Sequence, residues 1–176
     1  MKISVTVIIR DHLATLYNDS SGKRSYFDIF VFYFFPLLLA IGVYVFDLRL
    51  DVNSYSVSIT FFGIFLALLL NIQVAIFSIF RHKWKESEDE RKAALQDEEM
   101  STRRTLLGEL NANISYLTLV SCLALISFFV FYAATCEEGA APAFGVMLYS
   151  HFVLTLLMVI KRAHALFQKE YRDSPR

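Results

Sequence analysis

The chain has 176 residues, 56% of them hydrophobic and only 19% charged, and its formal net charge is zero. Soluble domains carry roughly a quarter charged residues and space their apolar residues with the period of a core-facing helix or strand. Here the apolar residues gather in long blocks instead. The composition therefore argues against a soluble domain and predicts a membrane protein.

Residues 1–24 are predicted to form a cytosolic or interfacial amphipathic segment. Five apolar residues would share one face of a helix there: Val5, Ile9, Leu13, Leu16 and Tyr17. Lys2 and Arg10 lie nearby, and a basic amphipathic helix beside a membrane span often lies in the interface. The alternative is a strand or helix that packs under the membrane helices.

Four apolar blocks follow along the chain: Phe27–Phe46, Ser56–Phe80, Ile114–Thr135 and Ala143–Ile160. About 20 apolar residues of helix cross the roughly 30 Å hydrocarbon core of a bilayer, and lipid leaves no partner for backbone groups outside a helix. The predicted fold class is therefore all-α, a polytopic membrane protein with four transmembrane helices. One pair of helices falls in residues 25–80 and the second pair in residues 111–162.

Proline and glycine mark where the predicted helices bend or continue. Pro36 lies inside the first block, where it removes a backbone hydrogen bond and is expected to kink the helix. From Ile64 to Leu107 there is neither Gly nor Pro, so the second helix is predicted to extend beyond the membrane. The predicted turn is Asp97–Thr102, which makes residues 81–110 a cytosolic helical hairpin formed by the second and third helices.

The charges are sorted along the chain. Every Lys and Arg except Arg49 lies in the N-terminal segment, in the central hairpin, or from Lys161 onward, at the end of the last span and in the basic tail at residues 163–176. The other two connections are short and carry acidic residues: Asp47 and Asp51, and Glu137 and Glu138. Because Lys and Arg stay on the cytoplasmic side of a bilayer, both termini and the hairpin are predicted to face the cytoplasm.

Small and polar residues recur every three or four positions on two of the predicted spans. The candidates for the lining of a pore are, on the second span, Thr60, Gly63, Ala67, Asn71 and Ser78, and, on the third, Asn111, Ser115 and Thr118. Such stripes let helices pack closely and hydrogen-bond in lipid, which is the structural interpretation. They also line water-filled paths, which is the functional one. One bundle of four helices has no room for a path at its centre, so a pore predicts a homo-oligomer, with a tetramer favoured.

Two further polar residues inside the spans are expected to have partners. Gln73 lies off the stripe of the second span, and an amide in lipid requires a hydrogen bond, here from another subunit or from Asn113. His151 is the one ionisable residue well inside a span, where hydrogen-bonded packing is more common than a proton relay.

The hairpin supplies the candidates for binding a ligand or a partner. Its turn would bring Arg91 and Lys92 close to Arg103 and Arg104. Repeated around an oligomer, these side chains would form a basic ring able to hold an anionic nucleotide or oligonucleotide. The alternative is a cytosolic partner protein. No arrangement of residues indicates catalysis, a metal site or a cofactor, so the sequence does not predict an enzyme.

The four spans and the hairpin, together with Ile9–Leu13, Ser25–Asp28 and Glu109–Tyr116, carry a resemblance to known proteins. The plan resembles the small membrane effectors of bacterial antiphage defence, first the Hailong-type channel effectors and second the membrane subunit of Kiwa systems. The resemblance implies a homo-oligomeric pore in the bacterial inner membrane. Its cytosolic helices would gate it in response to a ligand or partner, and its opening would depolarise an infected cell. The alternative function is a non-conducting membrane adaptor that recruits a cytosolic protein.

Overall fold

The structure, a computed structural model, describes residues 4–18, 23–24, 30–81 and 90–173. It is all-helical apart from one antiparallel pair of two-residue strands, β1 (Tyr17–Asn18) and β2 (Lys23–Arg24). The helical elements are α1 (Val5–Ala14), a π-helical turn (Phe30–Phe34), α3 (Phe35–Val45), α4 (Val52–Arg81), α5 (Glu90–Ala133) and α6 (Ala140–Asp173). The predicted all-α class is confirmed.

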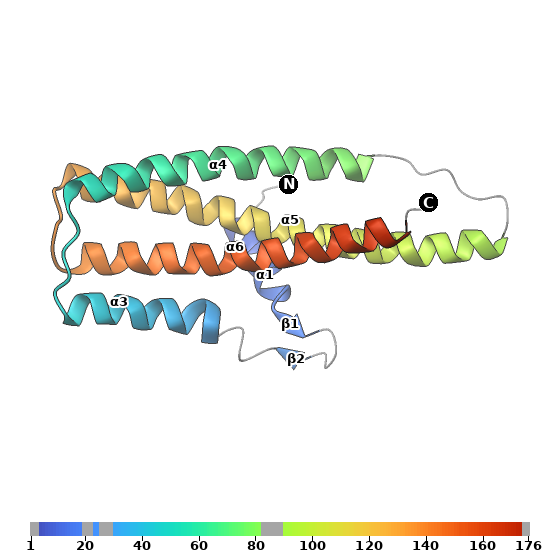
Figure 1. Cartoon of the computed structure of the whole chain (residues 1–176), viewed down its shortest axis with the longest axis horizontal. Coiled ribbons are helices and arrows are strands. Elements are labelled where there is room, and N and C mark those ends of the chain that lie inside the picture. Colours follow the sequence, from blue (N-terminus) through green and yellow to red (C-terminus); the bar gives the residue numbers. More distant parts are fainter. Residues whose placement is uncertain (1–3, 19–22, 25–29, 82–89, 174–176) are drawn as a thin grey trace.

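Figure 1 shows α4, α5, α6 and α3 side by side in that spatial order, with nearly parallel axes, and α1 running across them. The connections 46–51 and 134–139 meet at one end of the molecule, called here the Arg49 end. There the Leu50 N–H donates to the Glu137 carbonyl at 3.2 Å, and the Arg49 guanidinium lies 2.6 Å from the Glu138 carboxylate. The N-terminal helix α1 contacts α5 farther along the bundle.

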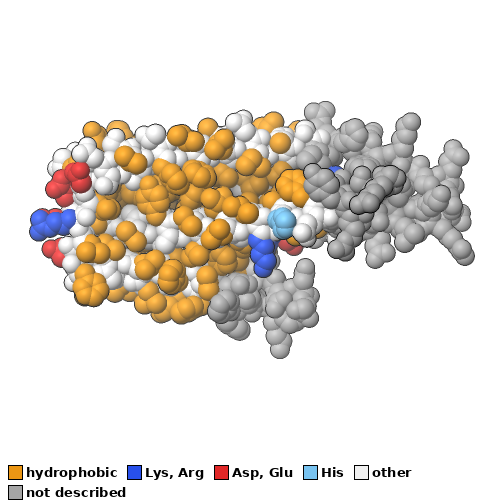
Figure 2. All heavy atoms as spheres, viewed as in Figure 1, with side chains coloured by type: hydrophobic (Ala, Val, Ile, Leu, Met, Phe, Trp, Pro, Cys, Tyr) orange, Lys and Arg blue, Asp and Glu red, His pale blue; other side chains and the backbone are white. Residues whose placement is uncertain are grey.

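Three helical segments are long and apolar enough to cross a membrane: Val52–Ser78, Met100–Ala133 and Ala140–Gln168. Phe30–Val45 forms a shorter apolar helix, and the start of the first predicted span, residues 25–29, lies outside the described part of the chain. In Figure 2 hydrophobic side chains cover the visible face, and charged side chains gather at its ends. The prediction of a membrane protein with transmembrane helices is therefore confirmed.

Aromatic side chains form the centre of the helix packing. Phe62 of α4, Phe128 of α5 and Phe152 of α6 are fully buried. The Phe62 ring lies 5.6 Å from that of Phe128 and 5.1 Å from that of Phe152. A Cβ at Gly145 would lie 3.0 Å from the Phe128 ring, so a glycine lets α6 approach it. Because lipid gives no hydrophobic force between helices, such close packing is what joins α4, α5 and α6.

The predicted turn at Asp97–Thr102 is wrong, because α5 runs through these residues without interruption. The segment contains good helix formers and neither Gly nor Pro, so an acidic cluster followed by two hydroxyl residues does not end the helix. The residues that join α4 to α5, 82–89, lie outside the described part of the chain.

The sequence predicts a kink at Pro36 inside a long helix, whereas the structure places this residue at the start of a helix. Pro36 occupies the first turn of α3, directly after the π-helical turn Phe30–Phe34. Because proline has no N–H, a carbonyl of the preceding turn loses its helical donor at this position. The change from π to α geometry therefore falls at the position where the proline stands.

Two helices at the Arg49 end finish in the same hydrogen-bonded motif. The N–H of Leu48 bonds to a carbonyl in the last turn of α3, and that of Cys136 to one in the last turn of α5, both at 3.0 Å. The preceding residues, Asp47 and Thr135, have φ angles of 47° and 50°. This left-handed position usually holds Gly, and a β-branched residue there is strained.

Replacing Thr135 by Gly should therefore stabilise the fold. We expect Thr135→Gly to raise the free energy of unfolding by about 1 kcal/mol, because it removes the clash between Cβ and the following carbonyl. Thermal unfolding in detergent, followed by circular dichroism, measures the change. Asp47→Gly is the matched control and should gain less, since Asp tolerates this conformation better. A lower melting temperature for Thr135→Gly would contradict the assigned strain.

Candidate functional site

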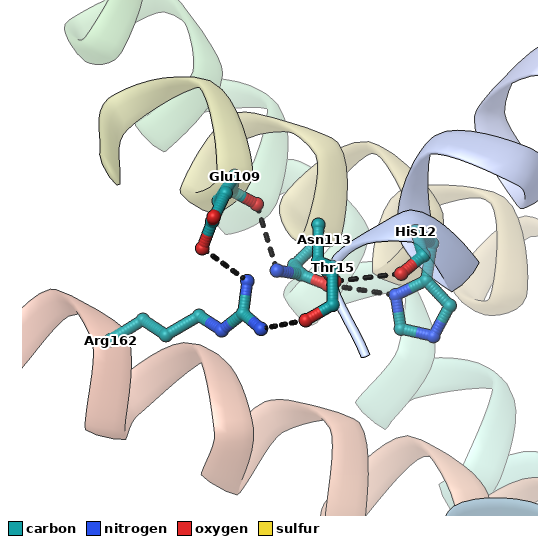
Figure 3. A network of polar contacts seen from close by, with 5 residues as sticks. All are labelled: His12, Thr15, Glu109, Asn113 and Arg162. Carbon is teal, nitrogen blue, oxygen red and sulfur yellow. Dashed lines mark hydrogen bonds and ion pairs between the residues drawn. The ribbon is translucent and has the colours of Figure 1, made fainter. Parts of the chain in front are cut away.

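Five polar residues from three helices meet where α1 crosses the bundle (Figure 3). They are His12 and Thr15 from α1 and its C-terminal cap, Glu109 and Asn113 from α5, and Arg162 from α6. We call this group the α1 latch. Each of its members forms a hydrogen bond or ion pair with another member, so the latch joins the N-terminal helix to two apolar helices.

The side-chain amide of Asn113 is the centre of the latch. Its Nδ2 donates to the Glu109 carbonyl at 2.7 Å, which fixes Oδ1 as the acceptor on the other side. Oδ1 lies 2.7 Å from His12 Nδ1 and 2.9 Å from the Thr15 hydroxyl. Because an amide oxygen only accepts, His12 must carry its proton on Nδ1. The hydrogen bonds thus determine the tautomer of the histidine.

Arg162 holds the C-terminal end of α1. Its guanidinium donates to the backbone carbonyl of Thr15, the C-cap of α1, and to the Glu109 carboxylate at 3.0 Å. The last carbonyls of a helix have no helical partner and carry partial negative charge, so a cation is favourable there. Both Arg162 and Glu109 are largely shielded, with side chains 21% and 34% exposed. One arginine therefore connects α1, α5 and α6.

His12 is completely buried although it lies on a surface helix. Its ring stacks on the Tyr116 ring with centroids 3.8 Å apart, and its Nε2 makes no hydrogen bond with the described residues. Burial lowers the pKa of His12 to about 4, although the hydrogen bond that it donates to Asn113 raises it, and nearby His151 and Arg162 lower it further. The imidazole is therefore neutral at neutral pH.

A second hydrogen-bonded chain leads from Tyr116 to the π-helical turn that precedes α3. The Tyr116 hydroxyl lies 2.8 Å from His151 Nε2, and His151 Nδ1 lies 2.7 Å from the Phe32 carbonyl. Since a carbonyl only accepts, Nδ1 carries the proton and Tyr116 donates to Nε2. Pro36 has no N–H to offer the Phe32 carbonyl four residues earlier, so His151 supplies the missing donor. The expected hydrogen-bonded packing of His151 is present.

The buried side of α1 differs from its apolar side. The residues that face the bundle are Ile8, His12, Thr15 and Leu16. Three residues of the predicted apolar face, Val5, Ile9 and Leu13, are exposed instead. The predicted helix is present and packs against α5, but it docks largely through its polar side.

The pore-lining candidates separate into an exposed and a half-buried group. Those exposed on α4 are Thr60, Ala67, Asn71 and Ser78, while Gly63 is half-buried. Those half-buried on α5 are Asn111, Ser115 and Thr118. The Ser115 hydroxyl accepts a hydrogen bond from Gln73 at 2.8 Å, which gives Gln73 a partner within its own chain. The two predicted stripes therefore do not form one open surface on a single chain.

The four basic candidates of the hairpin do not cluster as predicted. In a continuous α5, Arg91 and Arg103 are separated by about 18 Å along the helix axis. Arg104 is exposed and Arg103 half-buried, whereas the side chains of Arg91 and Lys92 lie outside the described part. A shared anionic ligand therefore has no compact site on a single α5 helix.

Sequence reasoning missed the latch as a site. It named Asn113 only as a candidate hydrogen-bond partner for Gln73. One signal was present: His12 and Thr15 lie three residues apart, and together with Ile8 they fall to one side of the apolar stripe. That spacing indicates a common face, but it cannot identify partners that lie about a hundred residues away.

No family model, no curated protein and no solved structure matches this chain. The resemblance to antiphage membrane effectors therefore stays a prediction. The groups of the latch hydrogen-bond one another across three helices and so join α1 to α5 and α6. Among the described residues, no three His, Cys, Asp or Glu side chains come together as a metal site would require.

Removing the Asn113 amide should release α1. Asn113→Ala leaves the buried Nδ1–H of His12 without an acceptor, at a cost of roughly 1–3 kcal/mol. An isolated helix as short as α1 is unstable in water, so we expect its backbone amides to exchange roughly tenfold to a hundredfold faster. Hydrogen exchange with mass spectrometry measures this. Asn71→Ala, which removes an amide without a partner, should leave α1 unchanged, and equal exchange in both variants would contradict the latch.

Acid should also release α1, because the docked histidine resists protonation. Docking is favoured fully above the ordinary histidine pKa of 6.5 and weakens by about 1.4 kcal/mol per pH unit below it. The loss ends near the docked pKa of about 4. A spin label at Ala14→Cys, with Cys122 and Cys136 replaced by Ser, should become mobile over this range. His12→Gln, which does not titrate, should abolish the pH dependence, and a pH-dependent signal in that variant would exclude His12 as its origin.

Proposed function

We propose that the chain crosses the bacterial inner membrane four times and assembles with further copies into a gated pore, with a tetramer favoured. Both termini face the cytoplasm, because the basic residues other than Arg49 flank the spans on one side. The fourth of these spans, which comes first along the chain, includes the apolar helix Phe30–Val45. In the setting that the resemblance implies, opening the pore would dissipate the membrane potential of an infected cell.

The observation that carries this proposal is the exposed amide of Asn71. The side-chain amide of Asn71 makes no hydrogen bond to the residues that the structure describes. By contrast, the Thr60 and Ser78 hydroxyls on the same face donate to carbonyls of their own helix. A short amide cannot be satisfied by lipid tails, so it requires another subunit or water. A water-filled path between subunits meets that requirement.

The depth of Asn71 supports its place in such a path. α4 and α5 pack side by side, and Gln73 bonds to Ser115, so Asn71 lies at about the level of Leu117. From there to the end of α5 at Ala133 is about 24 Å. That distance is less than the roughly 30 Å thickness of the hydrocarbon core, which puts Asn71 inside the membrane, toward its cytoplasmic side.

The interior of one chain leaves no place for a conduit, which supports an oligomer. Between α4, α5 and α6 the centre is filled by fully buried side chains, among them Phe62, Leu117, Phe128 and Phe152. Protein interiors of this kind are close-packed. A pore must therefore lie between chains, and the exposed face of α4 that carries Thr60, Ala67, Asn71 and Ser78 is the surface we assign to it.

The α1 latch suits a gate in this pore. Asn113 lies about 30 Å along α5 from Ala133, within two turns of the level of Asn71. Release of α1 would free both α5 and α6 at the cytoplasmic end of the path. α1 is bound by a few hydrogen bonds rather than by a large apolar contact, which is the kind of element that opens locally.

Planar-bilayer recording of the purified protein tests the proposal, with its mass in detergent determined on the same sample. We expect discrete currents from an oligomer, and Asn71→Leu should lower the single-channel conductance several-fold while the oligomer persists, because it removes a polar lining group. Ile72→Leu, an exposed apolar exchange one residue away, is the control and should leave the conductance unchanged. If the purified protein is a monomer and shows no current, in the wild type and in the latch variant Asn113→Ala, the proposal of a pore is overturned.

A second candidate function, a membrane adaptor, is favoured by the length of α5. Figure 1 shows α5 extending past the ends of α4 and α6. Between Glu90 and Glu109 this arm is about 28 Å long, long enough to bind a protein beyond the headgroups. Two results together would favour the adaptor. The oligomer would show no current, both in the wild type and in Asn113→Ala, and a cytosolic protein would co-purify with the wild type but not with a variant in which the charge of Arg104 is reversed.

A further inference from the structure

The outer side of α1 carries an exposed apolar stripe that no helix among the described residues covers. Val5, Ile9 and Leu13 follow one another at intervals of four residues and are 52%, 37% and 41% exposed. The same helix buries His12 and Thr15. A helix lying on a protein in water would show the opposite arrangement, with its apolar face turned inward. The arrangement of α1 therefore indicates an apolar surrounding beside the bundle.

The distance between the latch and the Arg49 end identifies that surrounding. Along α5, Asn113 lies about 30 Å from Ala133, and along α6, Arg162 lies about 33 Å from Ala140. The hydrocarbon core of a bilayer is about 30 Å thick. With the charged connections of the Arg49 end at one surface, the latch falls at the opposite boundary between acyl chains and headgroups. α1 thus crosses the bundle at the depth of a membrane interface.

Charged residues near the latch agree with this depth. Arg10 lies about a quarter turn around α1 from its apolar stripe and is highly exposed. On α6, Lys161 and His164 are exposed on either side of Arg162. In Figure 2 cationic and histidine side chains appear where the hydrophobic belt ends. Long basic side chains at such a boundary reach the phosphate groups while their stems stay in apolar surroundings.

We propose that the stripe of Val5, Ile9 and Leu13 binds the acyl chains of the bilayer leaflet that surrounds the latch. α1 is then a helix with two partners: its polar side is held by α5 and α6, and its apolar side by lipid. Its position depends on the leaflet as well as on the bundle. The assignment to the cytoplasmic leaflet rests on the orientation in the proposed function, but the contact with lipid does not.

Fluorescence quenching by brominated lipids tests the contact. In the full chain reconstituted in bilayers, Trp84→Phe removes the only tryptophan, and Leu13→Trp introduces one into the stripe. Because interfacial helices bury their apolar face roughly 5–10 Å below the headgroups, we expect lipids brominated near the headgroup to reduce the fluorescence by roughly half. Lipids brominated near the chain ends should quench less. Ala14→Trp, on the side away from the stripe, is the matched control and should be quenched less by both lipids.

Either of two other results would overturn the proposal. Quenching of Leu13→Trp by aqueous acrylamide but not by brominated lipid would place the stripe in water. Protection from both quenchers would place it against protein, either a second copy of the chain or another partner. Val5→Trp repeats the measurement in case Leu13→Trp does not fold. Because no current is measured, lipid quenching of a protein that never conducts would sustain this inference while the pore fails.

Discussion

The position of α1 depends on one buried amide. The side-chain oxygen of Asn113 accepts hydrogen bonds from His12 and Thr15, and its nitrogen donates one to the Glu109 carbonyl. Both polar groups of the amide therefore have partners. Arg162 adds a cation at the carbonyl end of α1. Without these contacts, α1 would place a histidine against apolar helices with no hydrogen bond at all. Polar groups at this depth cannot fall back on water, which makes the connection specific.

The need to pair polar groups that are shielded from water also explains how the larger helices pack. Where lipid is the solvent, apolar side chains gain nothing by leaving it, so contact between helices rests on close packing and on polar pairs. The aromatic centre around Phe62 and Phe128 supplies the first. The bonds of Gln73 to Ser115 and of Tyr116 to His151 supply the second. Among the described residues, the side-chain amide of Asn71 on α4 has no such partner.

The latch and the exposed face of α4 fit one proposed mechanism. Asn113 of the latch and Asn71 of that face lie within two turns of each other along the bundle, and α5 contributes to the latch on one side and packs on α4 on the other. A neutral, buried His12 keeps α1 docked at neutral pH. Loss of the proposed lipid contact, of the Asn113 hydrogen bonds or of the neutral imidazole would each free the same helix. Several inputs could thus act on one gate.

The sequence by itself determined that this is a helical membrane protein and where its apolar helices lie, because block length and hydropathy are local properties. It also indicated an N-terminal helix, and it failed at Asp97–Thr102, where helix propensity outweighed polar composition. Only the tertiary structure decided which side of α1 is buried and that His12 meets Asn113, residues 101 positions apart. Spacing along a helix shows which residues share a face, but the rotation of that face toward a neighbour is set by packing among helices distant in the sequence.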